Sequence, residues 1–285
     1  MGGKLATDIP KVLISTRFSF FGKSGWKSDY SDNPDDLFDK NRLLKRFWLF
    51  ENITLPCLKA QTDQDFHYYV LSSKLMPDWA KEKLVELCTK HLDESRFTIG
   101  FGPPAYVRRY QAWAIKNIAG ADHPVAQVVL DDDDALSTDF IANLKTHLTN
   151  LQSQGTLDVD KLPYFITFPR GYALSLRDKK PLLWAHKYIF INLGLTMIGT
   201  SSQKNIFGIS HKAAPKRFGF IRDDENLMYI RTLSDVNDSR VEQSVRWKEV
   251  TDWKTNKDVS TRFPFIKSLK VKSYAALAKI TPETD

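Results

Sequence analysis

The chain has 285 residues, a formal net charge of +7 and a sequence pI near 9.2. Hydrophobic residues make up 42% of the sequence and aromatic residues 12%, which supports a packed core and excludes a chain that is disordered throughout. No apolar run approaches the roughly 20 residues that span a bilayer. The basic balance favours an anionic partner: nucleotide phosphates, a phospholipid surface or nucleic acid. We expect a cytoplasmic protein in which Cys57 and Cys88 are small buried side chains.

The first half of the chain alternates predicted strands and helices. Short apolar, β-branched runs predict strands at Lys11–Phe20, Phe66–Leu71, Arg96–Phe101 and Val125–Leu130. Apolar residues at helical spacing predict helices at 37–49, 77–92, 107–120 and 138–151. Pro56 is expected to end or kink the first of these helices. This order predicts an α/β fold with a doubly wound, mostly parallel sheet and helices on both faces.

The second half has few long helices. Strands are predicted at Tyr164–Leu176, Ile191–Gly199 and Ile206–Ser210, which together suggest a smaller mixed sheet beside the first. The tail from Val241 onward is basic and is interrupted by Pro264.

Four consecutive carboxylates, Asp131–Asp134, follow the apolar strand VAQVVL and precede a helix that Ser137 or Thr138 can cap. Adjacent carboxylates repel one another and need cations or solvent. Ligands of parallel sheets gather at the carboxyl ends of the strands, where this run lies. Mg²⁺ and Mn²⁺ prefer such oxygens and share substrate phosphates as ligands. The run therefore predicts a cation bridging a diphosphate; the alternative is an acidic turn that only solvates a strand end.

The stretch Val129–Leu136 resembles the hydrophobic-Asp-x-Asp-Asp-x-hydrophobic element of GT-A-fold glycosyltransferases. The sequence is similar to the bacterial rhamnosyltransferase family in particular, through Thr16–Ser19 and the stretch Leu49–Ser73. This resemblance implies a GT-A-like, Rossmann-type fold. It also implies metal-assisted, inverting transfer of a sugar, such as rhamnose, from a dTDP-, UDP- or GDP-sugar donor. The acceptor would be a hydroxyl of a glycan or of a lipid-linked molecule.

The same resemblance implies roles for individual residues of the donor site. Asp133 would be the principal ligand of Mn²⁺ or Mg²⁺, and Asp131 would approach the ribose or the metal. Donor contacts would come from a further set of side chains: Asp132, Arg17, Arg109 and Ser72. Ser72 stands where many relatives carry an aspartate that reads the base. His211 could complete the metal shell, although a surface histidine beside Lys212 is the alternative.

An inverting transfer needs a group that deprotonates the acceptor hydroxyl. The acidic stretch 222–227 resembles the element that supplies this base, and Asp224 is the first candidate, with Asp223 and Glu225 beside it. The alternative is a helix N-terminus rich in acidic residues. The polar run 235–239 reads as a turn or as part of the acceptor side.

These assignments divide the chain into a glycosyltransferase domain, residues 1–240, and a basic C-terminal extension, residues 241–285. Within the domain, residues 10–150 would bind the nucleotide sugar and residues 151–240 the acceptor. The basic and apolar stretch 262–279 could contact a membrane surface peripherally, or pack on the domain with its lysines in water.

Two other functions fit some of the same observations. A non-catalytic nucleic-acid-binding protein would explain the pI. However, basic residues are scattered and there is no zinc-finger or helix-turn-helix pattern, so no nucleic acid is expected. A metal-dependent phosphoesterase could use the same acidic run.

Overall fold

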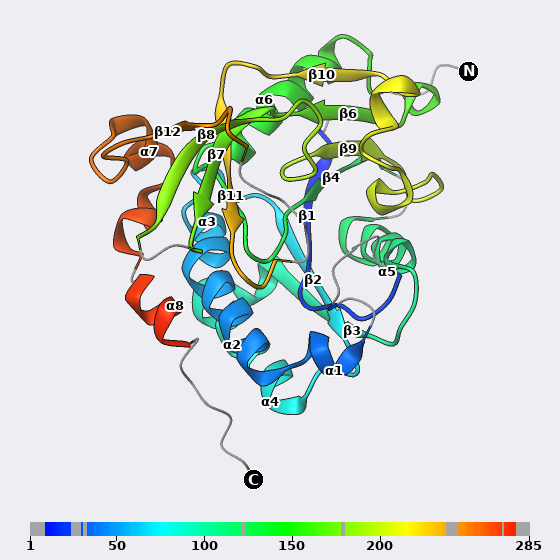
Figure 1. Cartoon of the computed structure of the whole chain (residues 1–285). Coiled ribbons are helices and arrows are strands. Elements are labelled where there is room, and N and C mark those ends of the chain that lie inside the picture. Colours follow the sequence, from blue (N-terminus) through cyan, green and yellow to red (C-terminus); the bar gives the residue numbers. More distant parts are fainter. Residues whose placement is uncertain are drawn as a thin grey trace.

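The computed structural model describes residues 9–23, 30, 33–120, 123–177, 180–237, 244–269 and 271–277. Two β-sheets form the centre of the protein, and helices pack around the larger one (Figure 1). No helix among these residues is long and apolar enough to cross a membrane.

The larger sheet has seven strands in the order β10-β6-β9-β4-β1-β2-β3. Its parallel part consists of β1 (Lys11–Arg17), β2 (His67–Ser73), β3 (Phe97–Gly102) and β4 (Val125–Val129). The other strands are β6 (Tyr164–Thr167), β9 (Thr196–Gly199) and β10 (Phe220–Arg222); β9 runs antiparallel to both β4 and β6. The four predicted strands of the first half are thus confirmed as one parallel unit.

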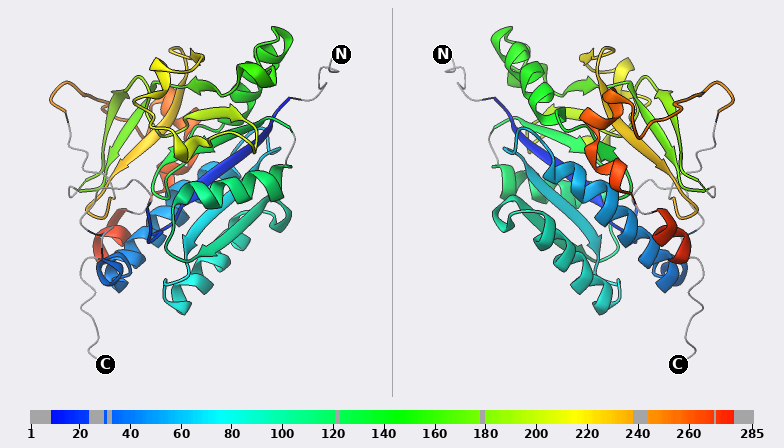
Figure 2. Two further views of the ribbon diagram at one scale, coloured as in Figure 1. Left: turned by 90° about the vertical axis from the view of Figure 1, so that its right-hand side faces the viewer. Right: turned by 90° about the vertical axis from the view of Figure 1, so that its left-hand side faces the viewer.

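Both faces of this sheet are covered, which explains why its central strands are rich in apolar residues. On one face, Val12 and Ile14 of β1 join a core with α2 (Lys40–Leu49), α3 (Leu55–Lys59), α4 (Asp78–His91) and α6 (Phe140–Ser153). On the other face, Leu13 packs with α5 (Val107–Ala114). Figure 2 shows α5 on one side of the sheet and α2 on the other. Cys57 and Cys88 are buried and free, as expected.

Pro56 does not end the helical segment after α1 (Pro34–Leu37), contrary to the expectation from sequence. Asp39 caps α2 by accepting a bond of 2.8 Å from the backbone N–H of Arg42. Helical backbone then continues through a π-helical stretch, Phe50–Thr54, into α3. Pro56 is tolerated because it stands in the first turn of α3.

The smaller sheet is mixed, with the order β12-β8-β7-β11-β5. Its strands are β5 (Ala135–Leu136), β7 (Arg170–Ser175), β8 (Leu182–Lys187), β11 (Leu227–Leu233) and β12 (Lys248–Glu249). The predicted strand 164–176 is divided between the two sheets, as β6 and β7. The predicted strand 206–210 is wrong, because Ile206–Gly208 forms a turn of 3₁₀ helix. Strands β5, β8, β10, β11 and β12 were not anticipated.

The C-terminal segment packs on the domain where the structure describes it. Strand β12 pairs with β8, and α7 (Lys257–Arg262) is followed by Phe263 and Ile266, which are fully buried. Helix α8 (Val271–Leu277) places Tyr274 5.1 Å from the ring of Trp48 on α2. Lys270 and residues 278–285 of the predicted basic tail, and residues 1–8 and 238–243, lie outside the described residues.

Candidate functional site

The four aspartates form the connection by which the chain passes from one sheet to the other. Strand β4 ends at Val129 in the larger sheet, and β5 begins at Ala135 in the smaller one, where it pairs with β11. The turn is held at both ends. Thr16 donates 2.7 Å to the carbonyl of Leu130, and Thr54 donates 2.9 Å to the carbonyl of Asp134. The backbone therefore fixes where each carboxylate points.

Two of the carboxylates pair with Arg46, which reaches them from α2. The guanidinium is 1% exposed and pairs with both oxygens of Asp132, which is fully buried. It also donates to Oδ2 of Asp133 at 2.8 Å. The expected donor contact of Asp132 is not supported by this placement, because its carboxylate is buried against Arg46. A bidentate pair of this kind favours arginine over lysine.

Asp133 and Asp134 are held by the end of β11 and the loop after it. Asn237 donates 2.6 Å to Oδ2 of Asp133, and the backbone N–H of Thr232 donates 2.8 Å to Oδ1 of Asp134. Burial raises the pKa of Asp134, and the charges of Asp133 and Asp131 raise it further, against the opposing effect of Arg231. Burial and the neighbouring carboxylates thus favour the protonated, neutral form of Asp134.

Asp131 is the aspartate of the run that is open to solvent, with 32% of its side chain exposed. Its Oδ1 accepts 3.0 Å from Arg17 at the end of β1. The guanidinium of Arg17 is buried and stacks 5.1 Å from the centroid of Phe207. The structure thus brings together Arg17 and Asp131, two residues predicted to contact the donor.

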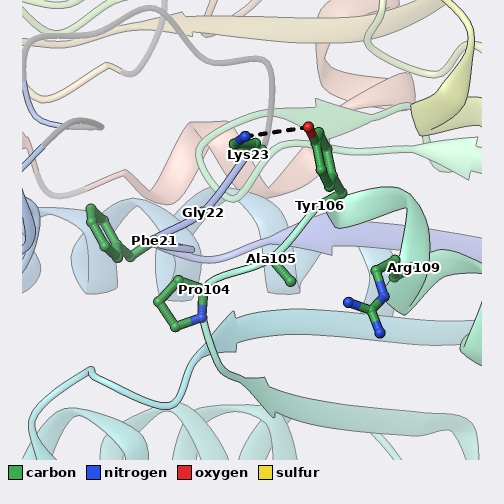
Figure 3. A pocket seen from close by; sticks show the side chains of 7 residues that line it. All are labelled: Phe21, Gly22, Lys23, Pro104, Ala105, Tyr106 and Arg109. Carbon is green, nitrogen blue, oxygen red and sulfur yellow. Dashed lines mark hydrogen bonds between the residues drawn. The ribbon is translucent and has the colours of Figure 1, made fainter.

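A cavity of about 460 Å³ opens at the same carboxyl edge of the sheet. It lies between the segments that follow β1 and β3, which are joined by a 3.0 Å bond from Lys23 N–H to the Ala105 carbonyl. Figure 3 shows its lining: Phe21, Gly22, Lys23, Pro104, Ala105, Tyr106 and Arg109. Lys23 donates to the hydroxyl of Tyr106 at 3.3 Å, so two of the lining side chains are joined. Arg109, a predicted donor-binding residue, is therefore in a cavity with a second cation and two aromatic rings.

Ser72 lies at the end of β2 but does not face this cavity. It is fully buried, and its hydroxyl donates to the sulfur of Met76 at 3.5 Å. The predicted role of Ser72 in reading the base is not supported, because its alternating position on the strand directs the side chain into the core.

The acidic stretch 223–225 is not next to the aspartate run. It forms the turn between β10 and β11, with no helix after it, whereas Asp134 contacts Thr232 near the other end of β11. The five-residue rise from Leu227 to Thr232 alone covers about 16 Å. Asp223 accepts bonds from His147 at 3.0 Å and from Asn226 at 2.9 Å, and Asp224 pairs with Lys187 at 3.0 Å. The assignment of the catalytic base to Asp224, Asp223 or Glu225 stays a prediction, which this placement does not favour.

His211 lies half-buried in the loop between β9 and β10. Burial lowers its pKa, and the nearby charges of Lys212 and Arg231 lower it further. Within the described residues, no three His, Cys, Asp or Glu side chains are grouped as metal ligands. His211 is thus not gathered with the aspartates into such a group, although Arg231 acts electrostatically on both His211 and Asp134.

His186 has a structural position on β8. Its Nδ1 lies 2.6 Å from the hydroxyl of Tyr229, and its ring packs edge-on at 4.8 Å from Trp247. Burial lowers its pKa from 6.5 to about 4, and the charge of Arg231 adds to the shift. The neutral imidazole is therefore the form that the fold accommodates.

This shift predicts how stability depends on pH. The unfolded chain binds a proton at His186 near pH 6.5, whereas the folded chain binds it only near pH 4, so stability falls as pH falls between these values. We expect the free-energy difference between wild type and His186→Gln to shrink by about 1–3 kcal/mol from about pH 7.5 to about pH 4.5. Urea unfolding at both pH values measures it, with the exposed His123→Gln as control. An equal difference at both pH values would show that this account of His186 is wrong.

The comparison with protein families agrees with the resemblance seen in the sequence. The family described as "Putative rhamnosyl transferase" matches residues 11–246, and the chain belongs to this family. No curated protein matches.

Solved structures of TarS from S. aureus show a distant likeness. The fragment 1–349 of TarS, in complex with UDP-GlcNAc, has a TM-score of 0.42 and 11% identity over 79% of this chain and 59% of that one. A structure of TarS has a TM-score of 0.37 and 11% identity over 80% of this chain and 37% of that one. The present chain thus spans about three fifths of the first of these structures.

Arg46 and Asn237 were missed by reasoning from sequence. The sequence contains a weak signal for Arg46, because an arginine on the core-facing side of an amphipathic helix needs a buried anionic partner. Asn237 offered none beyond its polar surroundings.

Proposed function

We propose that this protein is a glycosyltransferase that binds a nucleotide-diphosphate sugar at the carboxyl edge of the larger sheet. The observation that carries the proposal is the partly exposed Asp131 paired with Arg17 at the same edge as the cavity that Lys23 and Arg109 line. Cations suit the diphosphate, and the aromatic rings of Phe21 and Tyr106 suit the flat face of a base. Membership of the rhamnosyl transferase family supports sugar transfer, with rhamnose as the first sugar to test.

A divalent cation fits the aspartate run on the grounds of charge. Burial is the first cause of the raised pKa of Asp134, and the charges of Asp133 and Asp131, which a cation would offset, raise it further. Asp131 and Asp133 would hold Mn²⁺ or Mg²⁺, and the remaining ligands would be diphosphate oxygens and water, as is usual for Mg²⁺. When bound, such a cation stabilises the negative charge of the departing nucleoside diphosphate.

The residues of the chain would bind and orient the donor. Arg17 fixes the carboxylate of Asp131, and Arg46 with Asn237 fixes that of Asp133, so that neither needs to reorganise when the donor enters. Lys23 and Arg109 would bind the nucleotide end of the donor, which leaves the sugar near the smaller sheet. We assign acceptor binding to this second sheet, with a glycan or lipid-linked hydroxyl as acceptor and inversion as the outcome. A cytoplasmic location with peripheral membrane contact is part of the same proposal.

A thermal-shift panel tests donor binding. Because a ligand that binds only the native state stabilises it by mass action, a donor at 100 times its Kd should add about 2.7 kcal/mol to the free energy of unfolding. We expect a dTDP-, UDP- or GDP-sugar to raise the melting temperature, and Mn²⁺ to enlarge the shift. Free rhamnose and a DNA oligonucleotide serve as controls. If no nucleotide sugar shifts the melting temperature but the oligonucleotide does, the nucleic-acid-binding alternative replaces this proposal.

A further inference from the structure

The loop that follows β11 is the structure that completes the surroundings of Asp133. The side-chain amide nitrogen of Asn237 donates two hydrogen bonds, one of 2.6 Å to Oδ2 of Asp133 and one of 3.0 Å to the carbonyl of Thr232. The oxygen of the same amide accepts from the backbone N–H of Ser234. The carbonyl of Val236 accepts from Arg46 at 3.3 Å. A short loop therefore places one amide nitrogen between the backbone and a carboxylate of the acidic run.

This loop is clamped from outside by two side chains that both hold Asp235. Lys45 of α2 pairs with Oδ2 of Asp235, and the hydroxyl of Tyr274 on α8 donates to Oδ1. The ring of Tyr274 is 4% exposed and packs on Trp48 of α2. Asp235 itself has 52% of its side chain exposed, so its orientation depends on these two partners rather than on burial.

We propose that Tyr274 is a positioning residue of the site: by holding Asp235, it fixes the loop that keeps Asn237 against Asp133. Tyr274 belongs to α8, beyond residues 11–246, the stretch that matches the family. The positioning of the loop by Tyr274 is supported by the contacts alone. Its consequence for sugar transfer rests on the function proposed above.

The Tyr274 hydroxyl is expected to affect the site through the orientation of the Asp133 carboxylate. Asp133 Oδ2 accepts from Arg46, which is anchored in α2, and from Asn237, which is anchored only through its loop. Without the Tyr274 hydroxyl, Asp235 keeps its ion pair with Lys45 of α2. Because the ammonium group of a lysine is flexible, this pair alone holds the Asp235 carboxylate in one orientation less well than both partners do. Misplacement of a supporting group by a fraction of an ångström is enough to lower a rate.

Tyr274→Phe is the variant that isolates the hydroxyl, because phenylalanine retains the ring that packs on Trp48. We expect amide hydrogen exchange in residues 233–237 to become roughly tenfold faster while global unfolding changes little. With the donor found in the thermal panel, kcat should fall roughly tenfold and KM should stay within about twofold. The control is Tyr164→Phe, a tyrosine of β6 that lies on another part of the molecule (Figure 1).

A double-mutant cycle with Asn237→Ala separates positioning from a general structural effect. If Tyr274 acts through Asn237, Tyr274→Phe should lower kcat less than about twofold further in the Asn237→Ala background. Additive losses, or unchanged exchange in residues 233–237 of Tyr274→Phe, would overturn the proposal. If the wild type turns over no nucleotide sugar, the proposed function fails, and the exchange measurement still decides whether Tyr274 holds the loop.

Discussion

Replacing Arg46 with methionine is expected to lower the free energy of unfolding by about 3–5 kcal/mol. The reason is burial: Arg46 is 1% exposed, Asp132 is fully buried, and Asp133 is 6% exposed in its side chain. Methionine fills much of the same volume, so the loss comes from charge rather than from a cavity. Two carboxylates that folded against a guanidinium would be left in a medium of low polarity beside two further aspartates.

Urea unfolding near neutral pH measures this loss. Lys90→Met is the matched control, because Lys90 pairs with Glu51 at 2.8 Å but is 59% exposed. An exposed pair contributes about 0–1 kcal/mol, so the control should stay close to wild type. Removal of Asp132 together with Arg46, as Arg46→Met with Asp132→Asn, should restore part of the lost stability. A loss below about 1 kcal/mol for Arg46→Met would show that the acidic run does not depend on its arginine.

The parallel part of the fold could be predicted because its signals are local and strong. Strands such as Val125–Val129 are buried on both faces and therefore mostly apolar, and the intervening helices have clear apolar stripes. The second half was harder to predict for a physical reason. Short strands such as β10 and β12 are mostly exposed, and their pairing is set by partners far along the chain rather than by their own pattern.

The candidate site was predicted in part for the same reason. The position of the aspartate run at a strand end followed from the sequence, and the family resemblance placed Arg17 at the end of the first strand. The structure adds that these two strand ends are neighbours, because β1 and β4 pair in parallel. The distribution of roles within the run did not follow. Only tertiary contacts show that Arg46 forms an ion pair with Asp132 and that Asp131 is the carboxylate open to a ligand. The distance of Asp224 from the run likewise depends on the path of β11.

Asp131→Asn is expected to weaken binding of the nucleotide-sugar donor about 100-fold in the presence of Mn²⁺. The amide retains an oxygen that can accept from Arg17 but lacks the charge that a cation requires. Because Asp131 is partly exposed, the free energy of unfolding should change by less than about 1 kcal/mol. A loss of binding without a loss of stability is the pattern expected of a residue that contacts the ligand.

Asp224→Asn provides the matched comparison. Its side chain is also 32% exposed and also pairs with a cation at 3.0 Å, but at the other end of β11. We expect this variant to bind the donor as tightly as the wild type does. Its kcat tests the prediction that Asp224 is the catalytic base: a large fall in kcat with unchanged binding would support that role.

The most direct measurement is calorimetric titration of the donor from the thermal panel, with Mn²⁺, into wild type, Asp131→Asn and Asp224→Asn. The carboxyl edge of the larger sheet is the binding site if only Asp131→Asn loses affinity, by about 100-fold. Equal affinity of all three proteins for the donor would contradict a donor site at Asp131.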